Sequence, residues 1–158
     1  MQIREVSDPL EEIGAEVLVL FHLEDEPAPR GRLGQVDWIL CGALSRLRAR
    51  GKFAGECGRI ALLSPEGKLK TDKVLVIGLG HQVELSAIAL YRLSYQAAQA
   101  VLHLGCTRIA LEPPFRAFPD EVPARVRHAF LEAFLAELRR GQPAAGFAVA
   151  ILAPRGSC

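Results

Sequence analysis

Several residue types and patterns are missing from this sequence of 158 residues. It contains no asparagine and one tryptophan, and its four cysteines form no C-x-x-C pair. No apolar run approaches the roughly 18 residues that a membrane-spanning helix needs, and the start of the chain does not resemble a signal peptide. The net charge of +1 provides no overall attraction to nucleic acid or membrane. We therefore expect a cytoplasmic protein without membrane contact.

Residues that could carry chemistry are scattered along the chain. The cysteines have no histidine at metal-ligand spacing, which favours reduced thiols over a disulfide or a zinc site. The histidines do not pair on one helix, and no serine lies in a G-x-S-x-G context. We therefore expect no metal, no cofactor and no catalytic residue. The residues considered are Cys41, Cys57, Cys106, Cys158, His22, His81, His103, His128, Ser45, Ser64, Ser86 and Ser94.

The stretch 73–104 is the clearest structural unit in the sequence. Lys73–Leu79 is a short run rich in Val and Ile, which is typical of a strand buried on both faces of an α/β sheet. Two glycines interrupt the run, and a helix follows with Ser86 as its N-cap. Apolar residues recur at helical spacing as far as Leu104, so the unit is a strand, a glycine loop and a helix.

The rest of the chain alternates between similar elements. The expected strands are Gln2–Val6, Glu16–His22, Gly58–Ser64, Lys73–Leu79, Thr107–Glu112 and Phe147–Leu152. The expected helices are Val36–Gly51, Ser86–Leu104 and Glu121–Arg140, the last with Asp120 as its N-cap and Pro123 in its first turn. This order predicts an α/β fold with a parallel or mixed sheet and helices on both faces. We expect one domain, residues 1–158.

At this point the ordered series of motifs resembles a known family. A buried strand at Ala15–Phe21, then LSRLRARGKFAGECG, GRIALLS, KVLVIGLGHQVELSAIALYRLSYQAAQAV and TRIALEPP together look like the N-terminal domain of leucyl aminopeptidases. The matching stretches cover roughly Ala15–Leu152. The most specific part is the strand that runs into Gly-Leu-Gly, followed by a polar pair, a leucine and a helix cap.

The resemblance implies a three-layer α/β/α fold of the macro-domain type with a mixed sheet. It also implies that the two-metal peptidase site belongs to a separate C-terminal domain with an Asn-Thr-Asp-Ala-Glu-Gly-Arg-type motif. That motif does not occur in this sequence. We therefore expect a stand-alone, non-catalytic relative, although the sequence leaves open whether the chain is a full gene product or a fragment.

The glycine loop invites a second interpretation. Gly78-Leu79-Gly80-His81-Gln82-Val83 lacks the third glycine of a dinucleotide fingerprint, and no acidic residue follows at the expected distance. A tight turn explains the glycines without a ligand. The macro-domain likeness suggests a looser alternative, in which Gly78, Gly80, His81 and Ser86 form an anion or nucleotide site.

Charged clusters and the tryptophan have mostly structural explanations. Arg46, Arg48, Arg50 and Lys52 stand where cations favour a helix C-terminus, so a nucleic-acid surface is the weaker interpretation. The acids Glu24-Asp25-Glu26 are expected to be solvated. We place Trp38 at the edge of the core, with a partner interface as the alternative. The absence of asparagine fits a thermophile, but a GC-rich genome produces the same bias.

These observations leave two main hypotheses. The first is a non-catalytic domain that acts in self-association or binds a separately encoded aminopeptidase catalytic chain. The second is a binder of a nucleotide or ADP-ribose-like molecule at the Gly78–Ser86 loop. Nucleic-acid binding through the arginine clusters is a weaker third hypothesis.

Overall fold

The computed structural model describes residues 1–114, 124–141 and 146–153. The strands of this part are β1 (Gln2–Val6), β2 (Val17–Leu23), β3 (Ile60–Leu63), β4 (Lys73–Gly80), β5 (Arg108–Leu111) and β6 (Ala148–Leu152). The helices are α1 (Gly31–Ile39), α2 (Ala43–Ala49), α3 (Ala87–His103) and α4 (Ala124–Gly141), with short 3₁₀ turns η1 (Leu10–Glu12) and η2 (Gln82–Glu84). The expected strands and their order are confirmed.

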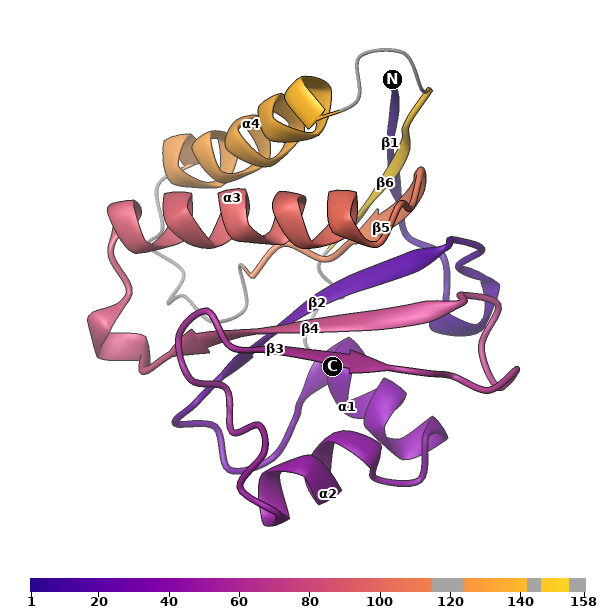
Figure 1. Ribbon diagram of the computed structural model, residues 1–158, viewed down its shortest axis with the longest axis vertical. Helices are drawn as coiled ribbons and strands as arrows, with labels where there is room; N and C mark the ends of the chain where they lie inside the picture. The colour runs from indigo at the N-terminus through magenta and orange to yellow at the C-terminus, as the bar shows by residue number, and fades with distance from the viewer. Residues whose placement is uncertain (115–123, 142–145, 154–158) are drawn as a thin grey trace.

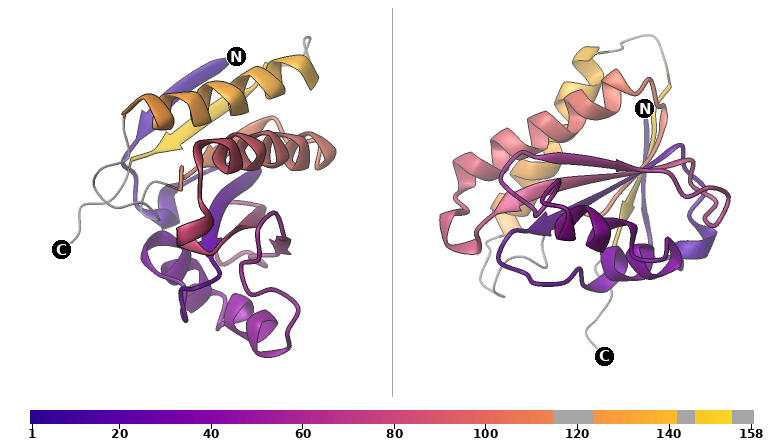
Figure 2. Two further views of the ribbon diagram at one scale, coloured as in Figure 1. Left: turned by 90° about the vertical axis from the view of Figure 1, so that its left-hand side faces the viewer. Right: turned by 60° about the horizontal axis from the view of Figure 1, so that its bottom comes forward.

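The strands form one sheet in the order β1-β6-β5-β2-β4-β3. All neighbours are parallel except β3, which is antiparallel to β4. Helices α3 and α4 cover one face, and α1 and α2 lie against the other (Figures 1 and 2). This arrangement confirms the three-layer α/β/α fold with a mixed sheet.

Strands β2 and β4 lie inside the sheet and explain the apolar runs of the sequence. Val17 and Val19 face the core under α3 and α4, whereas Leu18 and Leu20 face the core over α1 and α2. A strand covered on both faces has no polar side, so its sequence does not alternate. The same reason accounts for the burial of nearly all of β4.

The single helix expected at Val36–Gly51 is wrong, because the chain breaks it in two. Cys41 and Gly42 both have positive φ angles, 55° and 76°, which end α1 and turn the chain into α2. Asp37 stabilises the break, since its carboxylate accepts hydrogen bonds from the N–H groups of Leu44 (2.8 Å) and Ser45 (3.2 Å). The apolar spacing continues across the break, which is why periodicity alone suggested one helix.

Helices α3 and α4 agree with the predictions from the sequence wherever the structure describes the residues concerned. Ser86 caps α3 as expected, because its hydroxyl accepts a hydrogen bond from the N–H of Ala89 at 3.1 Å. Phe130 and Phe134 of α4 are buried in the core, as their spacing predicted. The proposed start of that helix, with Asp120 and Pro123, lies outside the described residues. None of the helices in the described ranges is long and apolar enough to cross a membrane.

Candidate functional site

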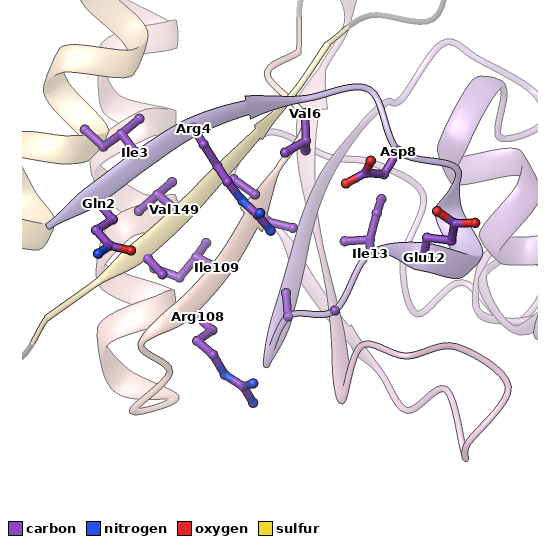
Figure 3. Close-up of a pocket in the computed structure, with 15 residues that line it drawn as sticks. Gln2, Ile3, Arg4, Val6, Asp8, Glu12, Ile13, Arg108, Ile109 and Val149 are labelled. Carbon is purple, nitrogen blue, oxygen red and sulfur yellow. The ribbon is translucent and has the colours of Figure 1, made fainter.

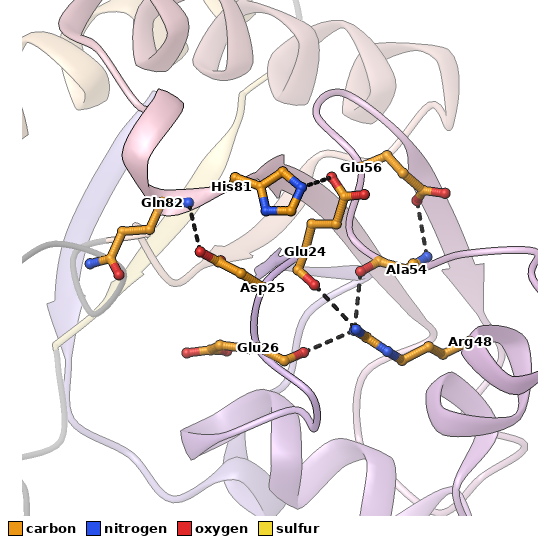
Figure 4. Close-up of polar contacts among 8 residues, drawn as sticks. All are labelled: Glu24, Asp25, Glu26, Arg48, Ala54, Glu56, His81 and Gln82. Carbon is orange, nitrogen blue, oxygen red and sulfur yellow. Dashed lines mark hydrogen bonds and ion pairs between the residues drawn. The ribbon is translucent and has the colours of Figure 1, made fainter.

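A groove and a loop are among the regions of the surface that could hold a small molecule. The groove, of about 360 Å³, lies across β1, β6 and β5 (Figure 3), and the sequence did not predict it. The loop is the sequence-predicted one, which lies at the carboxyl end of β4 (Figure 4).

Gly78 is in contact with another part of the main chain. A β-carbon at this position would lie 2.1 Å from the carbonyl oxygen of Glu56 and 2.6 Å from that of Gly55. The register between β2 and β4 also shifts here, where His22 pairs with Gly78 and Leu23 with Gly80. The close approach of segment 53–58 therefore explains why glycine stands at position 78.

Gly80 is held in a similar way. Its φ angle of +74° lies in the left-handed region that favours glycine. Its N–H donates to the carbonyl oxygen of Gly55 at 2.9 Å, and its own carbonyl oxygen accepts from the N–H of Glu24 at the same distance. The polar groups of this turn thus have partners in the chain itself. A ligand role for the two glycines stays a prediction.

His81 and Gln82, which follow Gly80, contact two acids of the segment 24–26. The expectation that these acids are only solvated is therefore wrong. His81 Nε2 lies 3.5 Å from a carboxylate oxygen of Glu24. The N–H of Gln82 donates to the carboxylate of Asp25 at 3.2 Å. The loops that follow β2 and β4 are therefore joined at the edge of the sheet (Figure 4).

Arg48 joins a third loop to these two. Its guanidinium donates to the carbonyl oxygens of Glu24 (3.1 Å), Glu26 (2.9 Å) and Ala54 (3.2 Å). From the sequence we expected this arginine to be explained by its place near a helix C-terminus, where a cation is favourable. Its main contacts are instead with backbone carbonyls of other loops, two of which are 22 and 24 residues away in sequence. Glu56 accepts a hydrogen bond from the N–H of Ala54, which holds the pKa of that carboxyl below its ordinary value.

His22 lies behind this network and is almost fully buried. Burial first, and the neighbouring Arg48 cation second, lower its pKa from 6.5 to about 4. Arg48 Nη1 is 3.3 Å from Nε2 of the ring, and because a guanidinium only donates, Nε2 accepts and the proton is assigned to Nδ1. The ring stacks on Phe53 with centroids 6.4 Å apart. His22 is therefore a neutral core residue at pH 7.

Ser86 is the last of the four predicted site residues. Turn η2 separates it from His81, and its hydroxyl is engaged in capping α3. The structure therefore brings Gly78, Gly80 and His81 together in one turn and uses Ser86 to begin the next helix. The binding role of all four stays a prediction.

A small hollow of about 60 Å³ opens at the same edge of the sheet, between the ends of β2, β4 and β5. Sites for nucleotide-sized molecules usually measure about 300–1,000 Å³. Beside this hollow, Arg32 pairs with Glu112 at 2.7 Å, and the arginine is almost fully buried. Within the described ranges, Nε and Nη2 of Arg32 have no hydrogen-bond partner. The sequence contained no signal for this pair, because Arg32 lies in α1 and Glu112 follows β5, 80 positions further along the chain.

The remaining candidate ligands do not come together in the part of the chain that the structure describes. No group of three or more His, Cys, Asp or Glu side chains is placed there to hold a metal ion. Cys41 and Cys57 are exposed free thiols, and Cys106 is a buried one whose pKa burial raises. Cys158 lies outside the described residues.

Trp38 does not lie at the edge of the core, so that expectation is wrong. It projects from α1 with 85% of its surface exposed. Such exposure is unusual for a large aromatic side chain, which commonly finds a partner at an interface. The alternative interpretation, a partner interface, stays a prediction.

Besides Trp38, the structure shows a further exposed apolar surface that we did not predict from the sequence. We call it the α3 patch. Its members are Val83 (93% exposed), Ile88 (67%), Tyr91 (60%) and Tyr95 (43%). The last three recur at helical spacing and form a second apolar stripe on α3, beside the stripe that faces the core. That second stripe was the signal available in the sequence. Tyr91 also lines an apolar groove of about 360 Å³ between α3 and the first half of α4.

Comparisons with known proteins agree with this architecture. The model of the family described as "Cytosol aminopeptidase family, N-terminal domain" matches residues 17–139. A probable cytosol aminopeptidase of Geobacter sulfurreducens is 30% identical over 87 residues, which are 55% of this chain and 18% of that protein. The chain thus corresponds to about a fifth of the length of the curated relatives it matches.

Solved structures show the same fold. A tomato leucine aminopeptidase mutant has a TM-score of 0.69 and 19% identity, over 97% of this chain and 32% of that one. The Trypanosoma brucei macrodomain in complex with ADP-ribose has a TM-score of 0.66 and 14% identity, over 96% of this chain and 63% of that one. At such low identity the likeness establishes the fold alone. The family match over residues 17–139 shows more: this chain belongs to the cytosol aminopeptidase family, in which it corresponds to the N-terminal domain.

Proposed function

We propose that this chain is a non-catalytic domain that acts by association. Its partner is either a second copy of the chain or a separately encoded aminopeptidase catalytic chain. The observation that carries the proposal is the α3 patch, where four large apolar side chains stand in solvent within 13 positions of sequence (Val83 to Tyr95).

The composition of the patch is that of a binding surface. Exposed apolar area is unfavourable in water by roughly 25 cal/mol per Å², and contiguous patches of it usually mark interaction sites. Tyrosine is enriched where proteins meet, because the ring buries a large area and the hydroxyl can still bond. The neighbouring groove between α3 and α4 would accept an apolar side chain, and Arg125 at its border would favour an acidic neighbour.

Trp38 supports a second contact on another part of the molecule. It projects from α1, which lies on the opposite face of the sheet from α3 (Figure 1). One flat partner surface cannot cover both places. We therefore assign the main contact to the α3 patch and a separate, smaller contact to Trp38.

The same proposal predicts no peptidase activity from this chain alone. The described residues offer no cluster that could hold the metals of such a site, and the match is to the N-terminal domain. We expect no turnover of a leucyl-peptide substrate with added Zn²⁺ or Mn²⁺. Turnover that stays with the purified chain and responds to its mutations would overturn this part of the proposal.

Association is tested by sedimentation velocity over a series of micromolar concentrations, with the chain alone and with an aminopeptidase catalytic chain from the same genome. We expect a concentration-dependent complex in one of these mixtures. Ile88→Glu should abolish it, whereas Ala136→Glu, on an exposed position of α4, should leave it intact. A monomer under all conditions would refute the proposal.

A second candidate function is binding of a nucleotide or ADP-ribose-like molecule by Gly78, Gly80, His81 and Ser86. It is favoured by the position of the loop at the carboxyl ends of parallel strands, and by the fold shared with a macrodomain that was solved with ADP-ribose. For such a ligand to enter, segments 24–26 and 53–58 would have to move away, because they occupy the edge in this structure.

Calorimetric titration with ADP-ribose, AMP and phosphate tests this candidate. Gly80→Val should abolish binding at this loop, and His81→Ala serves as a milder variant that keeps the turn. No heat of binding at millimolar ligand, or binding that both variants retain, would exclude the loop. The arginine clusters are a weaker basis for nucleic-acid binding, since Arg48 is engaged with three carbonyl groups.

A further inference from the structure

Among the residues that the structure describes, nothing covers the first half of β6 on the face of the sheet that carries α1 and α2, whereas Ala110 and Leu152 on the same face are buried. Strands β1, β6 and β5 are parallel to one another and to β2, and parallel sheets nearly always have both faces covered. Ala148 is nevertheless exposed and Ala150 only half-buried, although β6 has a strand on either side. Helices α1 and α2 lie under the other half of the sheet (Figure 2). The open part of this face, around Ala148 and Ala150, therefore needs an explanation.

The strand register shapes this face into a groove. Gln2, Ala148 and Arg108 lie side by side in one row across the sheet, and Arg4, Ala150 and Ala110 lie in the next. Short alanine side chains therefore form the floor, and longer polar side chains rise from the strands beside it. The resulting space measures about 360 Å³.

The segment that joins β1 to β2 forms the other wall. It contributes the buried side chain of Ile13, which makes this wall apolar at its base. It also contributes Asp8, whose carboxylate points across the groove toward Arg4 (Figure 3). A positive and a negative group thus face each other over a small apolar floor.

Neither charge is neutralised by the parts of the protein that the structure describes. The side chains of Arg4 and Asp8 form no hydrogen bond or ion pair among residues 1–114, 124–141 and 146–153. Arg108 differs, because it lies 3.7 Å from Glu16, whose carboxylate also accepts hydrogen bonds from two backbone N–H groups. The charged groups left for a ligand are therefore the guanidinium of Arg4 and the carboxylates of Asp8 and Glu12, of which Asp8 faces Arg4 (Figure 3).

We propose that this groove binds a small zwitterion, a compact molecule with one carboxylate and one ammonium group. Its carboxylate would pair with Arg4, its ammonium group with Asp8, and the carbon chain between them would lie on Ala148 and Ala150. A simple anion or cation would satisfy only one wall and meet a like charge at the other. Because both charged groups are exposed to solvent, affinity is expected in the millimolar range.

The spacing between the ligand's charges can be measured with ω-amino acids. Glycine, 4-aminobutyrate and 6-aminohexanoate share both charged groups and differ in the length of the chain between them. We expect one member to bind best in calorimetry and to shift the NMR signals of the alanine methyls of the groove floor. Acetate and ethylammonium, which carry one charge each, should bind at least about tenfold more weakly.

Three substitutions test the assignment of the residues. Arg4→Met and Asp8→Asn should each weaken binding by about tenfold or more, and Ala150→Leu should block it by filling the floor. Arg50→Met, a matched loss of an exposed arginine just after α2, should change nothing. If no member of the series binds at tens of millimolar, or if Arg4→Met and Asp8→Asn leave the affinity unchanged, the groove is not a zwitterion site. Arg4 and Asp8 are exposed, so their substitution should not prevent folding. These two variants therefore test the zwitterion site even if Ala150→Leu does not fold.

Discussion

The loop after β4 and the groove across β1, β6 and β5 both combine small residues with charged ones, but they use them differently. At the loop, Gly78 and Gly80 let segment 53–58 approach the strand, and the acids nearby bind His81 and Gln82. In the groove, Ala148 and Ala150 leave space open, and the charges of its walls face each other without contact. Small side chains therefore serve close packing in one region and an open hollow in the other. The presence of glycine or alanine alone does not distinguish the two.

The largest expected effect comes from breaking the packed region. Gly78→Ala would place a β-carbon 2.1 Å from a backbone oxygen, so we expect a loss of about 4 kcal/mol or more in the free energy of unfolding, or no folding at all. Gly14→Ala is the control, because its β-carbon would meet nothing within 4 Å. Chemical denaturation measures both. If Gly78→Ala is as stable as wild type, segment 53–58 moves easily and the loop is as open as the groove.

The covered face of the sheet is tested through α3. Leu93 is buried against the core, so Leu93→Ala should cost about 2–5 kcal/mol. Ile88→Ala, on the exposed side of the same helix, should stay within about 0.5 kcal/mol of wild type. Equal effects of the two substitutions in urea denaturation would show that α3 is oriented differently.

The packed loops should also make stability depend on pH. The pKa of His22 is about 4 in the folded state against 6.5 for an unperturbed histidine, so the unfolded chain binds more protons between these values. Stability should therefore fall as the pH drops from about 6.5 to 4, by at most about 3 kcal/mol. His22→Gln should flatten this part of the profile, and His81→Gln should not. A wild-type profile without that slope would mean that His22 is accessible to water.

The smallest expected effect concerns the helix that follows the loop. Ser86→Ala removes the hydroxyl that accepts from the N–H of Ala89, which should cost about 1 kcal/mol. The exposed Ser64→Ala is the control, with no measurable change in thermal unfolding expected. An unchanged melting temperature for Ser86→Ala would mean that the hydroxyl contributes no cap and is free for a ligand.

Local features of the fold could be predicted because each rests on neighbours in sequence. The buried strand at Lys73–Leu79 follows from an uninterrupted apolar run, and the start of α3 follows from a capping serine. The break between α1 and α2 was missed, because Cys41 adopts a positive φ that its residue type does not favour. Asp37 holds that break through contacts seven and eight residues further along the chain, a separation without a sequence signature.

By itself, the sequence determined the order of the strands along the chain, the three-layer fold and the family to which the chain belongs. The strands follow from apolar runs that are local in sequence, and the fold and family follow from the order in which such runs and short motifs succeed one another along the chain. Only the tertiary structure decided that Arg48 binds three carbonyl groups, that Trp38 is exposed, and that Arg4 faces Asp8 across an alanine floor. Such facts depend on which segments meet in space. Strand order in the sheet, β1-β6-β5-β2-β4-β3, sets those meetings, and it differs from the order along the chain.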